Sequence, residues 1–209
     1  MVTLAIQAGG QSRRMGRDKG LVRLGGRPLV AHLLERLSGL ADDVVVTTNH
    51  PEAYAFLGVR LASDPVSGAG ALAGLATALE AAAGDRTLVV ACDMPFVRLP
   101  LASHLLALAA DHDAVVPRLA GEFEPLLAVY GRACLPAVQA SLAAGQRRMI
   151  SFFSKVRLRP VEDDELRLLD PDGRSFFNVN TPEDLLEAER MLAHETGAST
   201  SPEPHPPGD

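Results

Sequence analysis

The sequence is poor in cysteine, in positive charge and in long apolar segments. Its 209 residues include two cysteines, Cys92 and Cys134, too few and too isolated for a disulfide framework or a zinc site. Acidic residues outnumber basic ones by 26 to 20, so the net charge of −6 gives no basic footprint for general nucleic-acid binding. No uncharged apolar run approaches the roughly 18 to 20 residues that span a bilayer. We therefore expect a cytoplasmic protein that binds neither nucleic acid nor a membrane.

The length and composition are those of one globular domain. A hydrophobic fraction of 47% and a charged fraction of 22% exclude a wholly disordered chain, and domains have about 150 residues. We expect the domain to cover residues 1–195. Residues 196–209 are rich in Pro, Ser and Thr and contain no large apolar residue, which predicts a disordered C-terminal tail.

Short apolar runs alternate with segments of helical composition along the first half of the chain. The runs that predict strands are Val2–Gln7, 44–46, 87–91 and 115–116, and the segments that predict helices are 29–40, 72–83 and 101–110. This alternation predicts an α/β fold, a single domain with a mostly parallel sheet and helices on both faces. Further along, 123–130 and 156–161 predict strands, 133–144 predicts a helix, and Thr181 followed by Pro182 predicts the start of a last helix.

The densest chemical signal is the segment 8–19, which follows the first predicted strand directly. Gly9 and Gly10 let the backbone approach a ligand closely and turn its amides toward anionic oxygens. Four cations lie within seven residues here: Arg13, Arg14, Arg17 and Lys19. Ligands of parallel sheets bind at this edge, which favours a polyphosphate site over a solvated basic loop.

The loop matches neither of the two common phosphate loops. A P-loop has Lys and then Ser or Thr after its last glycine, whereas Arg17 and Asp18 follow Gly16 here. The second glycine cluster, 68–74, misses the dinucleotide spacing by one residue. A Rossmann dehydrogenase is therefore disfavoured.

A second signal is Asp93, which comes just after the strand predicted at 87–91. Its carboxylate is expected at the sheet edge, facing the same crevice as the glycine loop. One carboxylate beside phosphate oxygens suits Mg²⁺, although an aspartate that shapes the turn before Pro95 is the alternative. Asp64, before Pro65 and the second glycine cluster, is a similar candidate with a stronger turn-forming alternative.

Six motifs in order over residues 2–193 resemble those of the molybdenum cofactor guanylyltransferases, the MobA family of nucleotidyltransferases. They are the loop 8–20, Asp64 with 72–74, 92–95, 124–126, 145–148 and 178–185. The first motif is shared with many sugar-phosphate and terpenoid-precursor nucleotidyltransferases. The pair Arg147-Arg148 and the Asn-Val-Asn-Thr-Pro run at 178–182 are more specific to the guanylyl branch. The resemblance implies a Rossmann-like nucleotidyltransferase fold.

The resemblance also implies roles for individual residues. Those expected to bind the nucleotide are Gln7, Ala8, Gly9, Gly10, Lys19, Asn49, Asp64 and Asp93. Those expected to act in catalysis are Lys19, Asp93, Arg13 and Arg14, with Mg²⁺ on Asp93. Those expected to bind the pterin are Arg147, Arg148, Asn178 and Asn180. Two positions depart from the family pattern: Gln7 stands where leucine is usual, and Ala71 where proline is usual.

The implied reaction is transfer of GMP from GTP to the terminal phosphate of the molybdenum-molybdopterin cofactor, with release of pyrophosphate. The implied partners are these two substrates, with cofactor-donating proteins and molybdoenzyme acceptors beside them. The acceptor phosphate is largely ionised at neutral pH, so no strong base is needed, and none of the six histidines lies in a motif.

Three other functions remain open from the sequence. Gly10 argues against a cytidylyltransferase that acts on the same pterin, because many cytidylyl enzymes have an Ala-Ala-Gly loop at this position. The short C-terminal half disfavours a sugar-phosphate nucleotidyltransferase. The presence of both Lys19 and Asp93 disfavours a nucleotide-binding module without turnover.

Overall fold

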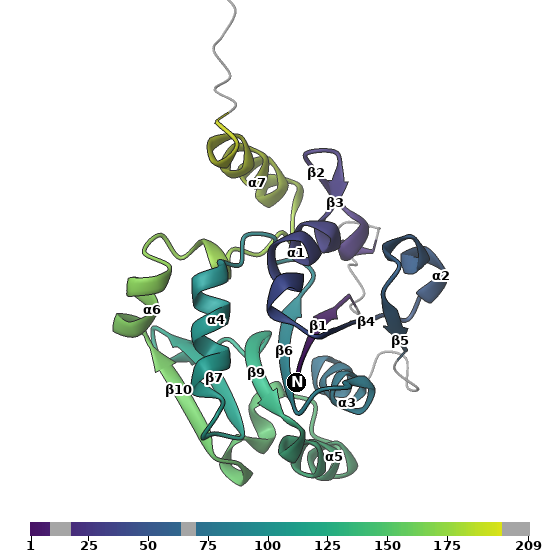
Figure 1. Ribbon diagram of the computed structural model, residues 1–209, viewed down its shortest axis with the longest axis vertical. Helices are drawn as coiled ribbons and strands as arrows, with labels where there is room; N and C mark the ends of the chain where they lie inside the picture. The colour runs from purple at the N-terminus through teal and green to yellow at the C-terminus, as the bar shows by residue number, and fades with distance from the viewer. Residues whose placement is uncertain (9–17, 64–69, 198–209) are drawn as a thin grey trace, which may run out of the picture.

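The computed structural model describes residues 1–8, 18–63 and 70–197 of the chain (Figure 1). Within these residues one large sheet has eight strands: β1 Val2–Gln7, β4 Asp43–Thr47, β5 Arg60–Ala62, β6 Arg86–Ala91, β7 Ala114–Leu119, β8 Glu122–Phe123, β9 Leu127–Gly131 and β10 Leu158–Glu162. Their order across the sheet is β10-β7-β9-β6-β1-β4-β5, and β8 pairs with β7. A second, two-stranded sheet joins β2 Arg23–Leu24 to β3 Arg27–Pro28.

The large sheet is mostly parallel, as the alternation of elements predicts. Strand β1 lies between β4 and β6 and is parallel to both. Strands β4 and β5 pair in parallel, as do β7 and β10. Strand β9 runs antiparallel to β6 and to β7, so those two share one direction. The central strands read as continuous apolar runs because both faces of the sheet are covered.

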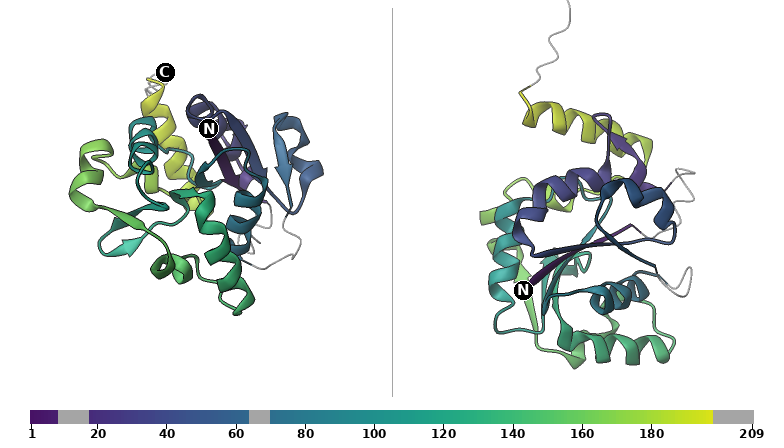
Figure 2. Two further views of the ribbon diagram at one scale, coloured as in Figure 1. Left: turned by 60° about the horizontal axis from the view of Figure 1, so that its bottom comes forward. Right: turned by 45° about the vertical axis from the view of Figure 1, so that its right-hand side comes forward.

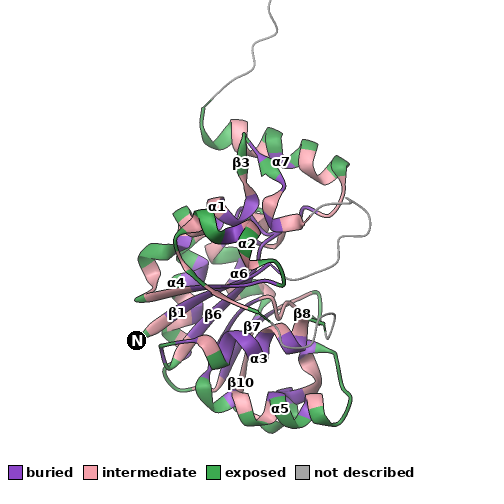
Figure 3. Ribbon diagram, turned by 90° about the vertical axis from the view of Figure 1, so that its right-hand side faces the viewer, coloured by how far each residue is buried: buried purple, intermediate pink, exposed green. Residues whose placement is uncertain are grey.

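Helices cover both faces of the sheet (Figures 1 and 2). The helices of the described residues are α1 Leu29–Leu37, α2 Pro51–Tyr54, α3 Ala71–Ala81, α4 Leu99–Leu108, α5 Leu135–Ala143, α6 Asp163–Leu169 and α7 Pro182–Glu195. Buried side chains of α1, α4 and α6 pack in one cluster with Leu4 and Ile6 of β1. Those of α3 and α5 pack in a second cluster with Ala5 of β1. This split follows from the alternation of side chains along a strand, and Figure 3 shows the buried strands between the helix layers.

Helix α7 packs beside the β2–β3 hairpin, away from the two main layers (Figure 1). The small core that joins them contains Leu24, Phe96, Val179 and Ala188, all almost fully buried. The predicted helix start is confirmed: Thr181 is the N-cap, Pro182 is the first helical residue, and α7 extends to Glu195. The last helix therefore brings the segment before it back to the edge of the sheet.

Two predictions from the sequence are wrong in detail. The strand predicted over 123–130 is two strands, because Pro125 and Leu126 form a turn between β8 and β9. The Leu127 amide closes this turn by donating to Glu124 O at 3.3 Å, and proline has no amide for a ladder. The helix predicted over 29–40 ends at Leu37, and a 3-10 turn, Ser38–Leu40, follows it. Across the described residues, no helix combines the length and apolar character needed to cross a membrane.

Candidate active site

The candidate site lies at the carboxyl ends of β1, β4 and β6. Gln7, the last residue of β1, is in register with Thr47 of β4 and with Ala91 of β6. The Ala8 amide donates to Thr47 O at 2.8 Å, and the Cys92 amide donates to Gln7 O at 3.0 Å. The three strand ends are thus held level. The segments that follow them begin at one edge of the sheet, where ligands of parallel sheets bind.

Lys19 is the centre of the described part of this site. Its ammonium lies 2.9 Å from Asp93 Oδ2 and also donates to Asn180 Oδ1. The Lys19 side chain is 25% exposed and the Asp93 side chain 13%, so the ion pair is screened only partly by solvent. An ammonium has three N–H donors and these contacts use two. Within the described residues, one donor of Lys19 therefore has no acceptor and could serve an anionic ligand.

Asn180 is held in place by the capping box that starts α7. Asp184 Oδ2 accepts the amides of Asn180 and Thr181, each at 2.8 Å, while the Asp184 amide donates to Thr181 Oγ1 at 3.1 Å. The Asn180 amide lowers the pKa of the Asp184 carboxyl, and the Thr181 contacts and the charge of Lys19 act in the same direction against the opposing effect of burial. The Val179 amide donates to Asp93 O at 2.8 Å, which ties this segment to the end of β6.

Lys19 itself is fixed from the other side by Asp18 and Tyr54. Asp18 caps the 3-10 helix Lys19–Leu21 by accepting the Gly20 amide at 3.2 Å, and it also accepts the hydroxyl of Tyr54. Burial raises the pKa of the Tyr54 phenol, and the bond to Asp18 adds to that shift, so the phenol remains a neutral donor. A Cβ on Gly20 would lie 2.5 Å from Tyr54 Oη, so a side chain there would have to displace the tyrosine hydroxyl.

The geometry at Asp93 suits a metal that arrives with a ligand. Its Oδ2 faces Lys19, its main-chain oxygen accepts from Val179, and no described residue donates to its Oδ1. In the part of the chain that the structure describes, no three His, Cys, Asp or Glu side chains cluster as metal ligands. One carboxylate with a free oxygen matches Mg²⁺ that is held mainly by phosphate oxygens and water.

The remaining residues singled out from the sequence are placed by other contacts or lie outside the described residues. Those outside are Gly9, Gly10, Arg13, Arg14, Arg17 and Asp64. Asn49 is exposed, two residues beyond the end of β4. Arg147 and Arg148 are exposed after α5, and Arg147 O lies 4.0 Å from the place of a Cβ on Gly70, beside the start of α3. Asn178 turns its side-chain amide to Phe176 O at 3.0 Å.

Sequence reasoning missed the residues that orient the lysine. Asp184 lies in the motif 178–185, but no capping role was predicted for it, although the Thr-x-x-Asp spacing is a capping-box signal. Tyr54 carries no local signal, because its partner Asp18 is 36 positions away.

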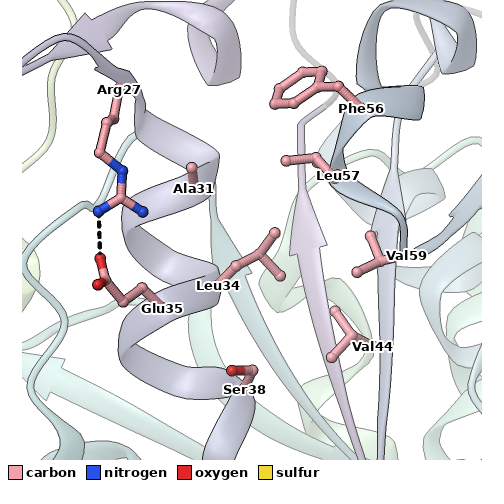
Figure 4. Close-up of a pocket in the computed structure, with 9 residues that line it drawn as sticks. All are labelled: Arg27, Ala31, Leu34, Glu35, Ser38, Val44, Phe56, Leu57 and Val59. Atoms are coloured by element: carbon pink, nitrogen blue, oxygen red, sulfur yellow. Dashed lines mark hydrogen bonds and ion pairs between the residues drawn. The ribbon is translucent and has the colours of Figure 1, made fainter.

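A separate hollow of about 480 Å³ lies between α1 and the segment around β5 (Figure 4). Leu34, Val44 and Leu57 line it, and an ion pair of 2.7 Å joins Arg27 to Glu35 at α1. It contains none of the residues of the candidate site.

Comparisons with known proteins agree on one family. Residues 4–160 match the model of the MobA-like NTP transferase domain. A probable molybdenum cofactor guanylyltransferase of Pelotomaculum thermopropionicum is 38% identical over 90% of this chain and 92% of its own. A molybdenum cofactor guanylyltransferase of Pseudomonas entomophila is also 38% identical, over 89% of this chain and 97% of its own.

The fold matches solved structures as well. The molybdopterin-guanine dinucleotide biosynthesis protein A of Archaeoglobus fulgidus aligns with a TM-score of 0.79 and 29% identity, over 92% of this chain and 99% of its own. A 2-C-methyl-D-erythritol 4-phosphate cytidylyltransferase of Thermus thermophilus aligns with a TM-score of 0.69 and 21% identity, over 90% of this chain and 97% of its own. The second likeness concerns the fold alone.

The close approach of Gly20 to Tyr54 gives a prediction for stability. Gly20→Ala should lower the free energy of unfolding by about 1–3 kcal/mol, because the new methyl group must displace the tyrosine hydroxyl from Asp18. Thermal and denaturant unfolding of the apo protein measures the change. Gly39→Ala is the matched control, since a Cβ at Gly39 meets nothing within 4 Å. Adding Tyr54→Phe should remove most of the Gly20→Ala effect, and equal stability of the two alanine variants would contradict the steric account.

Proposed function

The chain belongs to the MobA-like NTP transferase domain family, and from this premise we propose that it is a molybdenum cofactor guanylyltransferase. The proposed reaction transfers GMP from GTP to the terminal phosphate of the molybdenum-molybdopterin cofactor. The observation that carries the proposal is the contact of Lys19 with both Asp93 and Asn180 at the carboxyl edge of the sheet. This arrangement pairs a cation for phosphate with a carboxylate for a metal.

The chemistry is an in-line displacement at phosphorus. An oxygen of the acceptor phosphate bonds to the α-phosphorus of GTP, the bond from that phosphorus to the α–β bridging oxygen breaks, and pyrophosphate leaves with the electron pair. Lys19 directs the N–H that no described residue accepts toward the phosphate oxygens and offsets their negative charge. Asn180 holds the Lys19 ammonium in place by accepting its hydrogen bond, so the ammonium is positioned before the substrates bind.

Asp93 is the residue that would hold Mg²⁺, through the carboxylate oxygen to which no described residue donates. The ion supplies charge neutralisation at the phosphates of the bound nucleotide. Arg13 and Arg14, in the glycine loop, are proposed to stabilise the departing pyrophosphate beside Lys19. Ala8, Gly9, Gly10, Asn49 and Asp64 complete the proposed nucleotide site.

No general base or nucleophilic thiol is required. The acceptor phosphate, with a second pKa of about 6, is largely ionised at neutral pH. Burial raises the pKa of the Cys92 thiol far above its usual range, and burial raises that of Cys134 to about 12. Both cysteines are buried and unreactive, so the enzyme works by positioning and electrostatics.

The acceptor is proposed to bind on the side of α3 and α5. Arg147 and Arg148 are exposed there beside the start of α3, and they are proposed to bind the terminal phosphate of the pterin. Asn178 and Asn180, which flank the Val179 amide that donates to Asp93 O, are proposed to supply amide groups to the pterin. Proteins that deliver the cofactor and molybdoenzymes that receive the product are proposed as partners, in the cytoplasm.

The direct test is incubation of the protein with Mg²⁺, molybdopterin cofactor and each of the four nucleoside triphosphates. Mass analysis should find the guanine dinucleotide and pyrophosphate with GTP, and far less product with CTP, ATP or UTP. A cytosine dinucleotide as the main product would replace the proposal by a cytidylyltransferase. GTP binding with no transfer at all would indicate a module without turnover.

Asp93→Asn keeps the shape of the side chain and removes its charge. We expect turnover to fall by about 10² or more, the scale observed when one strong electrostatic stabiliser is lost. Guanylyl transfer is measured across a Mg²⁺ titration together with a thermal melt of the apo protein. Asp164→Asn, at an almost fully exposed carboxylate of α6, is the control and should leave turnover unchanged. Normal turnover of Asp93→Asn at low Mg²⁺ would remove Asp93 as a metal ligand.

Replacement of both Arg147 and Arg148 by alanine should weaken binding of the pterin and leave GTP affinity nearly unchanged. The expected loss is about 1.5–3 kcal/mol, the value of a charge-assisted hydrogen bond to phosphate. Calorimetric titration with each substrate measures it. Arg167→Ala, an exposed arginine on α6, is the control. Unchanged affinity for the pterin in the double variant would show that the pair is solvated surface.

A further inference from the structure

Gln7, the last residue of β1, carries a buried amide group that lacks a partner. The residue is 7% exposed, and no described group accepts a hydrogen bond from its Nε2. Buried side-chain amides are hydrogen-bonded in most proteins, because losing water without gaining a partner destabilises the folded state. An apolar side chain of the same size would fill this place without that cost. The amide therefore indicates a partner that the described residues do not provide.

The amide lies at the edge where the candidate site is built. Gln7 is in register with Ala91, two residues before Asp93, and the Cys92 amide donates to the main-chain oxygen of Gln7. Neighbouring strands are about 4.8 Å apart, and a nucleoside triphosphate is longer than that. One nucleotide with its phosphates at Lys19 and Asp93 can therefore reach the side chain of Gln7 with its other end, which is the base.

The start of α3 leaves room for the amide. Side chains alternate along β1, so Gln7 points to the same face as Ala5, which packs with α3. A Cβ on Gly74, in the first turns of α3, would lie 3.0 Å from Gln7 Oε1 and 3.7 Å from its Nε2. The absence of a side chain at Gly74 leaves the space that the Gln7 amide occupies beside the helix.

We propose that Gln7 selects the base of the nucleotide, with its Nε2 donating a hydrogen bond to the 6-oxo oxygen of guanine. The inference rests on the proposed function, which supplies GTP as the nucleotide. Guanine presents an acceptor at position 6, whereas adenine presents an amino group there that cannot accept from Nε2. A buried donor left without its acceptor discriminates strongly against a base that lacks it. Gln7 is thus a specificity-determining residue of this chain.

The test compares GTP with 2-aminopurine riboside triphosphate, which lacks the 6-oxo oxygen of guanine and, with it, the hydrogen on N1. Calorimetric titrations are made with the unchanged protein and with Gln7→Leu. The unchanged protein should bind GTP about tenfold or more tightly than the analogue. In Gln7→Leu the ratio of the two affinities should approach one, while the affinity for the analogue stays nearly the same.

Two further measurements separate base selection from packing. Gln7→Leu removes the unpartnered donor, so the apo variant should melt at the same temperature or about 2–4 °C higher. Gly74→Ala retains the glutamine but pushes its amide aside, so it should also reduce the affinity ratio. A full affinity ratio in Gln7→Leu would overturn the inference. So would an equal loss of both nucleotides together with a lower melting temperature.

Failure of the inference and failure of the proposed function give different results. Guanylyl transfer with no preference for GTP over the analogue would overturn the role of Gln7 and leave the enzyme proposal in place. A preference that depends on Gln7, without any transfer to the pterin, would overturn the enzyme proposal and support the role of Gln7.

Discussion

The described site depends on one ammonium group that bridges distant parts of the chain. Lys19 contacts Asp93, 74 positions later, and Asn180, 161 positions later. Lys19 follows β1 in the chain, Asp93 follows β6, and Asn180 precedes α7. Because the Lys19 ammonium contacts an oxygen of Asp93 and an oxygen of Asn180, it joins the segment after β1, the end of β6 and the start of α7 at one point. The capping box of α7 and the bond from Tyr54 to Asp18 both serve to hold that point still.

The bridge contributes more to function than to stability. Ion pairs that solvent reaches contribute at most about 1 kcal/mol, and both side chains of this pair keep some exposure. An ammonium that already faces a carboxylate and an amide oxygen loses little freedom when a phosphate arrives. The geometry is therefore prepared in the free protein, which suits a reaction that depends on positioning and charge neutralisation and needs no base.

The sequence predicts the architecture and one of the two contacts of Lys19, the one with Asp93. Parallel strands end at one edge, so the segments that follow β1 and β6 begin close together, which favours a contact between Lys19 and Asp93. Asn180 could be singled out only by resemblance, and for the pterin, because no local pattern says where a helix at the far end of the chain will pack. The turn at Pro125 and Leu126 was missed for a related reason, since apolar residues continue on both sides of it. The unpartnered amide of Gln7 emerged only when the neighbours of β1 were in place.

The central claim is that Asn180 acts through Lys19, and a double-mutant cycle on turnover tests it most directly. Lys19→Met, Asn180→Leu and the double variant are compared by kcat/KM for guanylyl transfer, with thermal melts as the control for folding. If Asn180 works by positioning the ammonium, it should matter only while the ammonium is present. The account predicts that the double variant is about as slow as Lys19→Met alone. Effects that simply multiply would contradict it.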